Sequence, residues 1–273
     1  MHKKLFNRLF ICLLFFTQIV LAGTSDEQSP NIKTQSVAYT VNGEEFAGYY
    51  AYDANQTGKH PGVLVVHEWW GQNAYARKRA EDLAKEGYPA FALDMYGTGK
   101  ATEHPDEATA FMQATFEKAD TIPERFDAAY NWLKQQPQVD AEHIAAIGYC
   151  YGGGVVLAMA RAGKDLDAVA SFHGSLATET PAEKGEVKAK VAVFTGADDK
   201  MVPPEQVQAF EQEMQNAGVD YMLKSYPNTL HSFTNPAATE LGKKTGMPIA
   251  YNAEADKDSW QRMLEVFEEA FGE

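Results

Sequence analysis

The sequence predicts an α/β protein with one mainly parallel sheet and helices on both of its faces. Short apolar runs, such as residues 63–66, have the composition of strands buried on both faces, and they alternate along the chain with longer amphipathic segments. The chain has 273 residues, of which 45% are apolar, and this is enough to bury the core of one such domain.

The first elements are expected to form an antiparallel hairpin at the edge of the sheet. Residues 37–41 and 46–52 have strand patterns, and Asn42-Gly43 between them is a favoured hairpin turn. Residues 23–36 are polar and are expected to form a flexible lead. The domain is therefore expected to span residues 37–273.

The rest of the chain alternates between strand and helix patterns. Gly87 and Gly218 mark helix ends, and Pro203 suits the first turn of a helix. Residues 241–252, which contain two glycines and a proline, are expected to form a loop that serves as a lid over the His231 side. Strands are predicted at residues 63–66, 90–94, 144–147, 169–172, 191–195 and 221–225, and helices at 74–85, 106–118, 123–135, 203–217 and 256–271.

The N-terminus has the pattern of a secretory signal peptide at residues 1–22. Three basic residues precede an apolar stretch at residues 9–16, and Val20-Leu21-Ala22 is a small-residue cleavage site. A signal anchor is the alternative, although the stretch is short for a bilayer span of about 20 residues. Cleavage would remove Cys12 and leave Cys150 alone, without an internal disulfide. The sequence therefore predicts an exported protein, periplasmic or secreted.

The charge balance is acidic, with 38 Asp and Glu residues against 24 Lys and Arg and a formal net charge of −14. Such a surface repels nucleic-acid phosphates and anionic lipids. We therefore expect neither nucleic acid nor a membrane as a partner after signal cleavage.

Cys150 lies at the centre of Gly148-Tyr149-Cys150-Tyr151-Gly152, between an apolar strand pattern and a helix pattern rich in small residues. A strand, a sharp turn and a helix in this order form the nucleophile elbow of the α/β-hydrolase fold, whose flanking glycines allow strand and helix to pack closely. A lone cysteine in an apolar segment is more often a small core residue. The groups that follow Cys150 along the chain favour the nucleophile.

An acid and a histidine follow Cys150 in the order expected for an α/β-hydrolase triad. Asp199 comes after the strand at 191–195, and His231 lies in a loop after the last predicted strand. His231 would take the thiol proton, and Asp199 would orient and stabilise the imidazole. Asp198 is a close rival for the acid.

The segment His67-Glu68-Trp69-Trp70-Gly71 directly follows the buried strand at 63–66. This loop normally supplies one oxyanion-hole amide, so the N–H groups of Trp69 and Tyr151 are expected to converge on the oxyanion. A zinc protease is excluded, because no second histidine follows His67-Glu68 at the required spacing. We expect no metal site. The substrate pocket is expected to be lined by Trp70, Tyr96 and Tyr149, whereas His67 and His173 are expected to be structural.

Together these residues resemble the dienelactone hydrolase family, the carboxymethylenebutenolidases of the α/β-hydrolase superfamily. The matching segments are Val65-Val66-His67-Glu68-Trp69-Trp70-Gly71, Leu93-Asp94-Met95-Tyr96, Gly148-Tyr149-Cys150-Tyr151-Gly152-Gly153, Asp199 with Val202-Pro203, and His231-Ser232-Phe233. The resemblance implies a Cys150-His231-Asp199 triad, with Glu68 contacting the resting thiol and helping to keep it protonated until substrate binds. It implies hydrolysis of a small-molecule ester or lactone through a thioester, with no cofactor.

The chain departs from this family at two places. The dienelactone enzymes hold the substrate carboxylate with two arginines, where this chain has Gly97-Thr98-Gly99 and Thr234-Asn235. Dienelactone itself is therefore a doubtful substrate. A general carboxylesterase, thioesterase or peptidase-like enzyme on the same scaffold is one alternative, and a non-hydrolytic binding or redox-sensing protein that uses Cys150 is another. The residues leave open the natural substrate and the oligomeric state.

Overall fold

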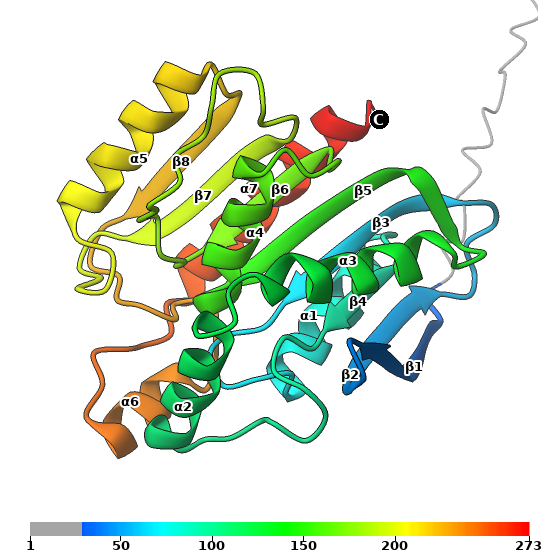
Figure 1. Ribbon diagram of the computed structural model, residues 1–273, viewed down its shortest axis with the longest axis horizontal. Helices are drawn as coiled ribbons and strands as arrows, with labels where there is room; N and C mark the ends of the chain where they lie inside the picture. The colour runs from blue at the N-terminus through cyan, green and yellow to red at the C-terminus, as the bar shows by residue number, and fades with distance from the viewer. Residues whose placement is uncertain (1–28, 273) are drawn as a thin grey trace, which may run out of the picture.

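The computed structural model describes residues 29–272, which form an eight-stranded sheet covered by helices on both faces (Figure 1). The predicted signal peptide lies outside these residues. The strands are β1 (Ile32–Val41), β2 (Glu44–Asp53), β3 (His60–Val66), β4 (Ala90–Leu93), β5 (Val139–Tyr149), β6 (Ala168–Phe172), β7 (Lys190–Gly196) and β8 (Tyr221–Tyr226). The helices are α1 (Ala74–Lys85), α2 (Pro105–Phe116), α3 (Thr121–Lys134), α4 (Tyr151–Arg161), α5 (Pro204–Ala217), α6 (Ala238–Thr245) and α7 (Ala253–Phe271).

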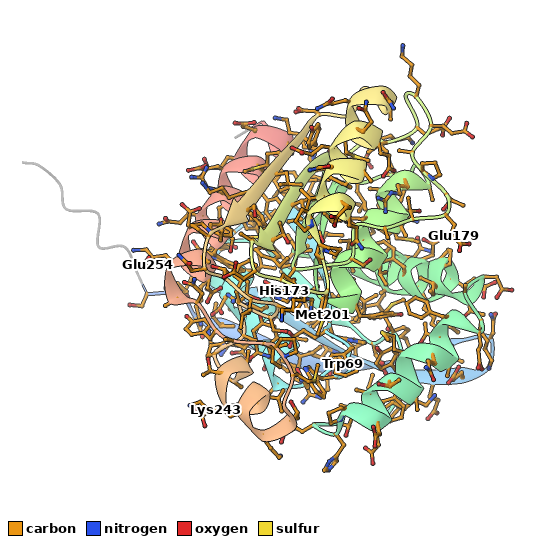
Figure 2. The ribbon with its side chains drawn as sticks, turned by 90° about the vertical axis from the view of Figure 1, so that its left-hand side faces the viewer. Trp69, His173, Glu179, Met201, Lys243 and Glu254 are labelled. Atoms are coloured by element: carbon orange, nitrogen blue, oxygen red, sulfur yellow. The ribbon has the colours of Figure 1, made fainter. Side chains whose placement is uncertain are left out.

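The sheet is mainly parallel, as predicted. Its order is β1-β2-β4-β3-β5-β6-β7-β8, and all neighbours from β4 to β8 pair in parallel, whereas β1 and β2 pair antiparallel at one edge. Parallel strands connected by helices place their carboxyl ends at one edge, where reactive groups of such folds gather. Figure 2 labels Trp69, His173 and Met201, which follow β3, β6 and β7.

The core consists of two apolar layers, one on each face of the sheet. Helices α3, α4 and α5 cover one face, and α1 and α7 cover the other. Side chains alternate between the two layers along each strand. In β5, Ala146 packs in the first layer, and Ile147 and Tyr149 pack in the second.

The structure differs from the predicted elements at three places. Strand β1 begins at Ile32, which pairs with Asp53, so residues 32–36 of the predicted flexible lead belong to the sheet. Strand β5 begins at Val139, before the predicted start at residue 144. Part of the predicted loop at 241–252 is helix α6. This helix contains Gly242, and a larger residue would not fit there. The backbone of the following segment passes close by, and a Cβ at this position would lie 2.5 Å from the Ile249 carbonyl oxygen.

No helix within residues 29–272 is long and apolar enough to cross a membrane.

Candidate active site

Cys150 occupies a strained turn between β5 and α4. Its φ is +54° and its ψ is −112°, a conformation that residues with a side chain rarely adopt. The flanking glycines make the turn possible: a Cβ on Gly148 would lie 2.1 Å from the Gly152 carbonyl oxygen, and one on Gly152 would lie 2.3 Å from that of Val66. The strain holds the thiol at the carboxyl edge of the sheet, as in a nucleophile elbow.

His231 and Asp199 are joined by a buried hydrogen bond. The His231 Nδ1–H donates to Oδ2 of Asp199 at 2.7 Å, and the Met201 amide donates to Oδ1 at 2.8 Å. Asp198 is exposed, whereas Asp199 is 3% exposed. The structure therefore brings Asp199, and not its neighbour, to the imidazole.

The other ring nitrogen of His231 faces the cysteine. Nε2 makes no well-aligned hydrogen bond, but Cys150 is the neighbour whose charge acts on it most strongly. Burial alone would lower the pKa of His231, and the negative charge of a Cys150 thiolate together with the Asp199 hydrogen bond reverses this and raises it to about 10. Nε2 of His231 is therefore placed to exchange a proton with the Cys150 side chain.

Glu68 is 2% exposed and lies close enough to His231 for their charges to interact. Its Oε2 accepts a 2.7 Å hydrogen bond from Asn235, and Oε1 has no partner among the described residues. Burial raises the pKa of Glu68, whereas the Asn235 hydrogen bond and the positive charges of His231 and Arg79 oppose that rise. No hydrogen bond within residues 29–272 links this carboxyl to Cys150, so the contact between Glu68 and the resting thiol stays a prediction.

His67 has a structural role, as predicted. Its Nδ1–H donates to the Glu68 carbonyl at 2.5 Å, and its Nε2 accepts from the Met95 amide at 3.1 Å. Burial lowers the pKa of His67, so the ring is neutral and fixes the backbone that carries Glu68.

The two predicted oxyanion donors lie on adjoining segments. Tyr151 is the first residue of α4, and Trp69 lies in the loop after β3. The Gly152 amide donates to the His67 carbonyl at 3.1 Å, which ties this loop to the first turn of the helix. The amides of Trp69 and Tyr151 make no hydrogen bond to another described residue, so both are free to donate to a substrate oxygen.

Cys150 and His231 open into a mainly apolar cavity of about 460 Å³. Its walls come from α2, α4 and the loops after β6 and β7. The lining residues are Met112, Phe116, Ile122, Cys150, Tyr151, Gly154, Val155, Ala158, Arg161, Ser175, Ala177, Thr178, Met201, Val202 and His231.

The aromatic residues predicted to line the pocket lie elsewhere. Tyr149 packs on Phe172 in the core, because the residue before the elbow points to the opposite face of β5. Tyr96 is buried against the rings of His67 and Tyr151. Trp70 lines a separate cavity of about 810 Å³ between α1 and α6.

A chain of buried polar groups supports the loop that carries His231. Arg79 donates to the Thr234 carbonyl at 2.7 Å, and the Thr234 hydroxyl lies 2.6 Å from the Tyr75 hydroxyl and 2.8 Å from Nε2 of His173. Burial, with the charge of His231, holds the pKa of His173 well below its ordinary value. Sequence patterns did not single out Arg79, because an isolated polar residue in a helix is usually solvated. They identified Asn235 only as part of a departure from the family pattern, without a role of its own.

Within residues 29–272, no group of three or more His, Cys, Asp or Glu side chains is arranged to hold a metal ion.

The chain is similar to known proteins over most of its length. Residues 46–271 match the model of the dienelactone hydrolase family. Protein usf of Aquifex pyrophilus is 29% identical over 86% of this chain and 98% of its own length. A solved dienelactone hydrolase-like promiscuous phosphotriesterase from metagenomic libraries is 34% identical, with a TM-score of 0.82 over 88% of this chain and 98% of that one. The solved structure named m3DLH is 36% identical, with a TM-score of 0.81 and the same coverage.

Proposed function

The chain belongs to the dienelactone hydrolase family, an α/β-hydrolase family, and from this premise we propose that it hydrolyses a carboxylic ester or lactone with Cys150 as the nucleophile. The observation that supports the proposal best is the strained Cys150 facing an imidazole that a buried carboxylate holds. A thiol that only senses oxidants has no need of the pair formed by His231 and Asp199.

In the proposed reaction the Cys150 thiolate attacks the substrate carbonyl carbon and forms a C–S bond, which moves an electron pair onto the carbonyl oxygen. Collapse of this intermediate breaks the ester C–O bond, and the imidazolium of His231 gives its proton to the leaving alkoxide. Neutral His231 then takes a proton from water, which attacks the thioester. The C–S bond breaks, the acid leaves, and the thiolate–imidazolium pair forms again.

The amides of Trp69 and Tyr151 would stabilise the two tetrahedral intermediates. Both are backbone groups, so they are already oriented before the reaction, and one such donor contributes about 3 kcal/mol to the transition state. Asp199 keeps the His231 ring in the tautomer that this proton transfer requires.

A panel of p-nitrophenyl esters, lactones and aryl thioesters tests the proposed reaction. The enzyme should release p-nitrophenol in a burst that matches the enzyme concentration if deacylation is slow, and mass spectrometry of quenched enzyme should find the acyl group on Cys150. Modification of another residue, or no turnover of any member, would argue against the proposal.

A neutral phosphotriester is a second candidate substrate, favoured by the charge balance of the cavity. Away from the catalytic His231, Arg161 is the cation among its described lining residues, and Glu213 neutralises it. A cavity of this kind suits an uncharged electrophile, and a neighbour at 34% identity is named a promiscuous phosphotriesterase. Paraoxon therefore belongs in the panel.

Removing the Asn235 side chain should shift the acid limb of the pH profile to higher pH. Asn235 donates the hydrogen bond that favours ionised Glu68, so Asn235→Ala should raise the pKa of that buried carboxyl further. Protonated Glu68 no longer stabilises the imidazolium of His231. The measurement is kcat/KM against pH for wild type and Asn235→Ala.

Glu68→Gln is the matched control, because glutamine does not titrate. The double variant Glu68→Gln/Asn235→Ala should have the same acid limb of the kcat/KM profile as the single variant Glu68→Gln. Superimposed profiles for wild type and Asn235→Ala would show that ionisation of Glu68 does not limit the reaction.

We also propose that the protein is exported, on the pattern of residues 1–22. Expression in a bacterial host should give a periplasmic or secreted protein whose first residue is Gly23. Edman sequencing of the purified protein checks this, and an N-terminus that retains the apolar stretch would contradict it.

A further inference from the structure

The cavity that holds Cys150 follows one face of helix α4. Cys150, Gly154, Ala158 and Arg161 all line it, and their spacing of four, four and three residues places them in one stripe along the helix. Eleven residues separate the two ends of the stripe, which corresponds to about 16 Å along the axis. We call this cavity the channel: along α4 its lining extends from Cys150 at one end of the stripe to Arg161 at the other.

Small residues keep the floor of this channel open. Gly154 has no side chain, and Ala158 is exposed although its neighbours Leu157 and Met159 are buried. Larger side chains at these positions would fill the space above the helix.

The walls of the channel are apolar and accessible. Phe116 is 54% exposed and Met201 is 41% exposed, and these are the exposed large hydrophobic residues of the described chain. Both line this cavity, as do Met112 and Ile122. Exposed apolar side chains that gather around one cavity indicate an apolar ligand.

Arg161 gives the far end of the channel a polar character. Its side chain is 6% exposed, and it donates through Nε and Nη2 to the Glu213 carboxylate at 2.8 and 2.9 Å and through Nη2 to the Leu176 carbonyl at 3.0 Å. Its Nη1 donates to no described residue. A buried cation that already has its counter-ion can donate to a neutral oxygen, whereas a second carboxylate there would repel Glu213.

We propose that this channel binds the acyl part of an elongated, uncharged ester, with an apolar chain along α4 and an oxygen acceptor at its far end that bonds to Nη1 of Arg161. The acyl part is assigned because the channel begins at Cys150, to which the acyl group becomes bonded. This inference rests on the proposed function.

Blocking the channel at Ala158 tests the position of the chain. In Ala158→Phe, kcat/KM for p-nitrophenyl octanoate should fall at least about tenfold more than kcat/KM for p-nitrophenyl acetate, because each methylene that loses its contact costs binding. Ala209→Phe is the matched control, since Ala209 is also an exposed helical alanine and does not line the cavity.

The two variants separate the possible failures. An equal loss for acetate and octanoate, or no loss for octanoate, would overturn the channel proposal while ester hydrolysis stands. A loss confined to long alkyl acetates would place the alcohol part in the channel and would also overturn it. No hydrolysis of acetate by wild type would reject the proposed function itself.

The far end is tested with three esters of equal length, p-nitrophenyl octanoate, 7-oxooctanoate and hydrogen suberate. Wild type should hydrolyse the oxo ester about two- to tenfold better than octanoate, as one added hydrogen bond predicts, and the suberate least well. In the double variant Arg161→Met/Glu213→Met, which leaves no unpaired buried charge, the advantage of the oxo ester should disappear. Preference for suberate, or an oxo advantage that survives in the double variant, would overturn the role of Arg161.

Discussion

Replacement of Cys150 by alanine is expected to lower kcat for p-nitrophenyl esters by about 10³-fold or more, the loss typical of an enzyme without its nucleophile. In the proposed reaction the sulfur of Cys150 forms the covalent intermediate, and Cys150 lines the same cavity as His231. Steady-state kinetics with p-nitrophenyl acetate measure the loss. Iodoacetamide should likewise abolish wild-type activity while labelling this residue.

The same variant has a second readout that depends on charge. The thiolate raises the pKa of His231 to about 10, so the wild-type imidazole should stay protonated at about pH 8. In Cys150→Ala the pKa should fall, because the contribution of Cys150 is lost and burial is then opposed only by Asp199, through its hydrogen bond and charge, and by the charge of Glu68. Imidazole NMR titration measures both forms, and buried His173, which stays neutral, is the internal control. Retained activity in the variant, with an unchanged His231 titration, would remove Cys150 from the reaction.

The elbow could be predicted from the sequence because its requirements are local. Two glycines flank Cys150 at fixed spacing, and the structure shows that a Cβ at either would collide with a nearby backbone carbonyl. Asp199 and His231 could be predicted for a related reason. They follow strands of a parallel sheet, and the carboxyl ends of such strands meet at one edge whatever their separation in the chain.

The lining of the cavity could not be predicted in the same way. Aromatic residues beside the catalytic motifs were expected there. Tyr151, after the elbow, does line the cavity, but Tyr149, before the elbow, points to the opposite face of the sheet. The residues that do line the cavity come from α2, α3, the length of α4 and the loops after β6, β7 and β8. Their association depends on how helices pack, which local patterns do not encode. Arg161 illustrates this: only the fold pairs it with Glu213, 52 positions further on.

Glu68 shows a different limit of prediction from the sequence. Its burial beside His231 agrees with the position that the motif predicts, but its hydrogen-bond partner depends on a residue in another loop. Where the resemblance implies an arginine, this chain has Thr234-Asn235, and Asn235 is a neutral donor. The Glu68 carboxyl is therefore held without a positive charge at the position of Asn235. This agrees with a proposed substrate that carries no carboxylate.

Replacement of Asp199 by asparagine is expected to lower kcat by about 10³- to 10⁴-fold, with little change in Tm. The carboxylate accepts the Nδ1–H of His231 and so keeps Nε2 facing Cys150 as the proton acceptor. An asparagine amide can donate to Nδ1, and the ring then carries its proton on Nε2, where it cannot accept the thiol proton. The side-chain shape is retained, and the Met201 amide still has an oxygen to bond, so the fold should tolerate the change.

Asp198→Asn is the matched control for this prediction, because Asp198 is the neighbouring acid and is exposed to solvent. Its kcat should stay within about twofold of wild type, since an exposed carboxylate without a buried partner contributes little. Kinetics and thermal melts of both variants decide between the two acids. A larger loss in Asp198→Asn would move the triad acid to Asp198. An equal and small loss in both would mean that His231 keeps its tautomer without a carboxylate, and the hydrogen bond at 2.7 Å would then be structural rather than catalytic.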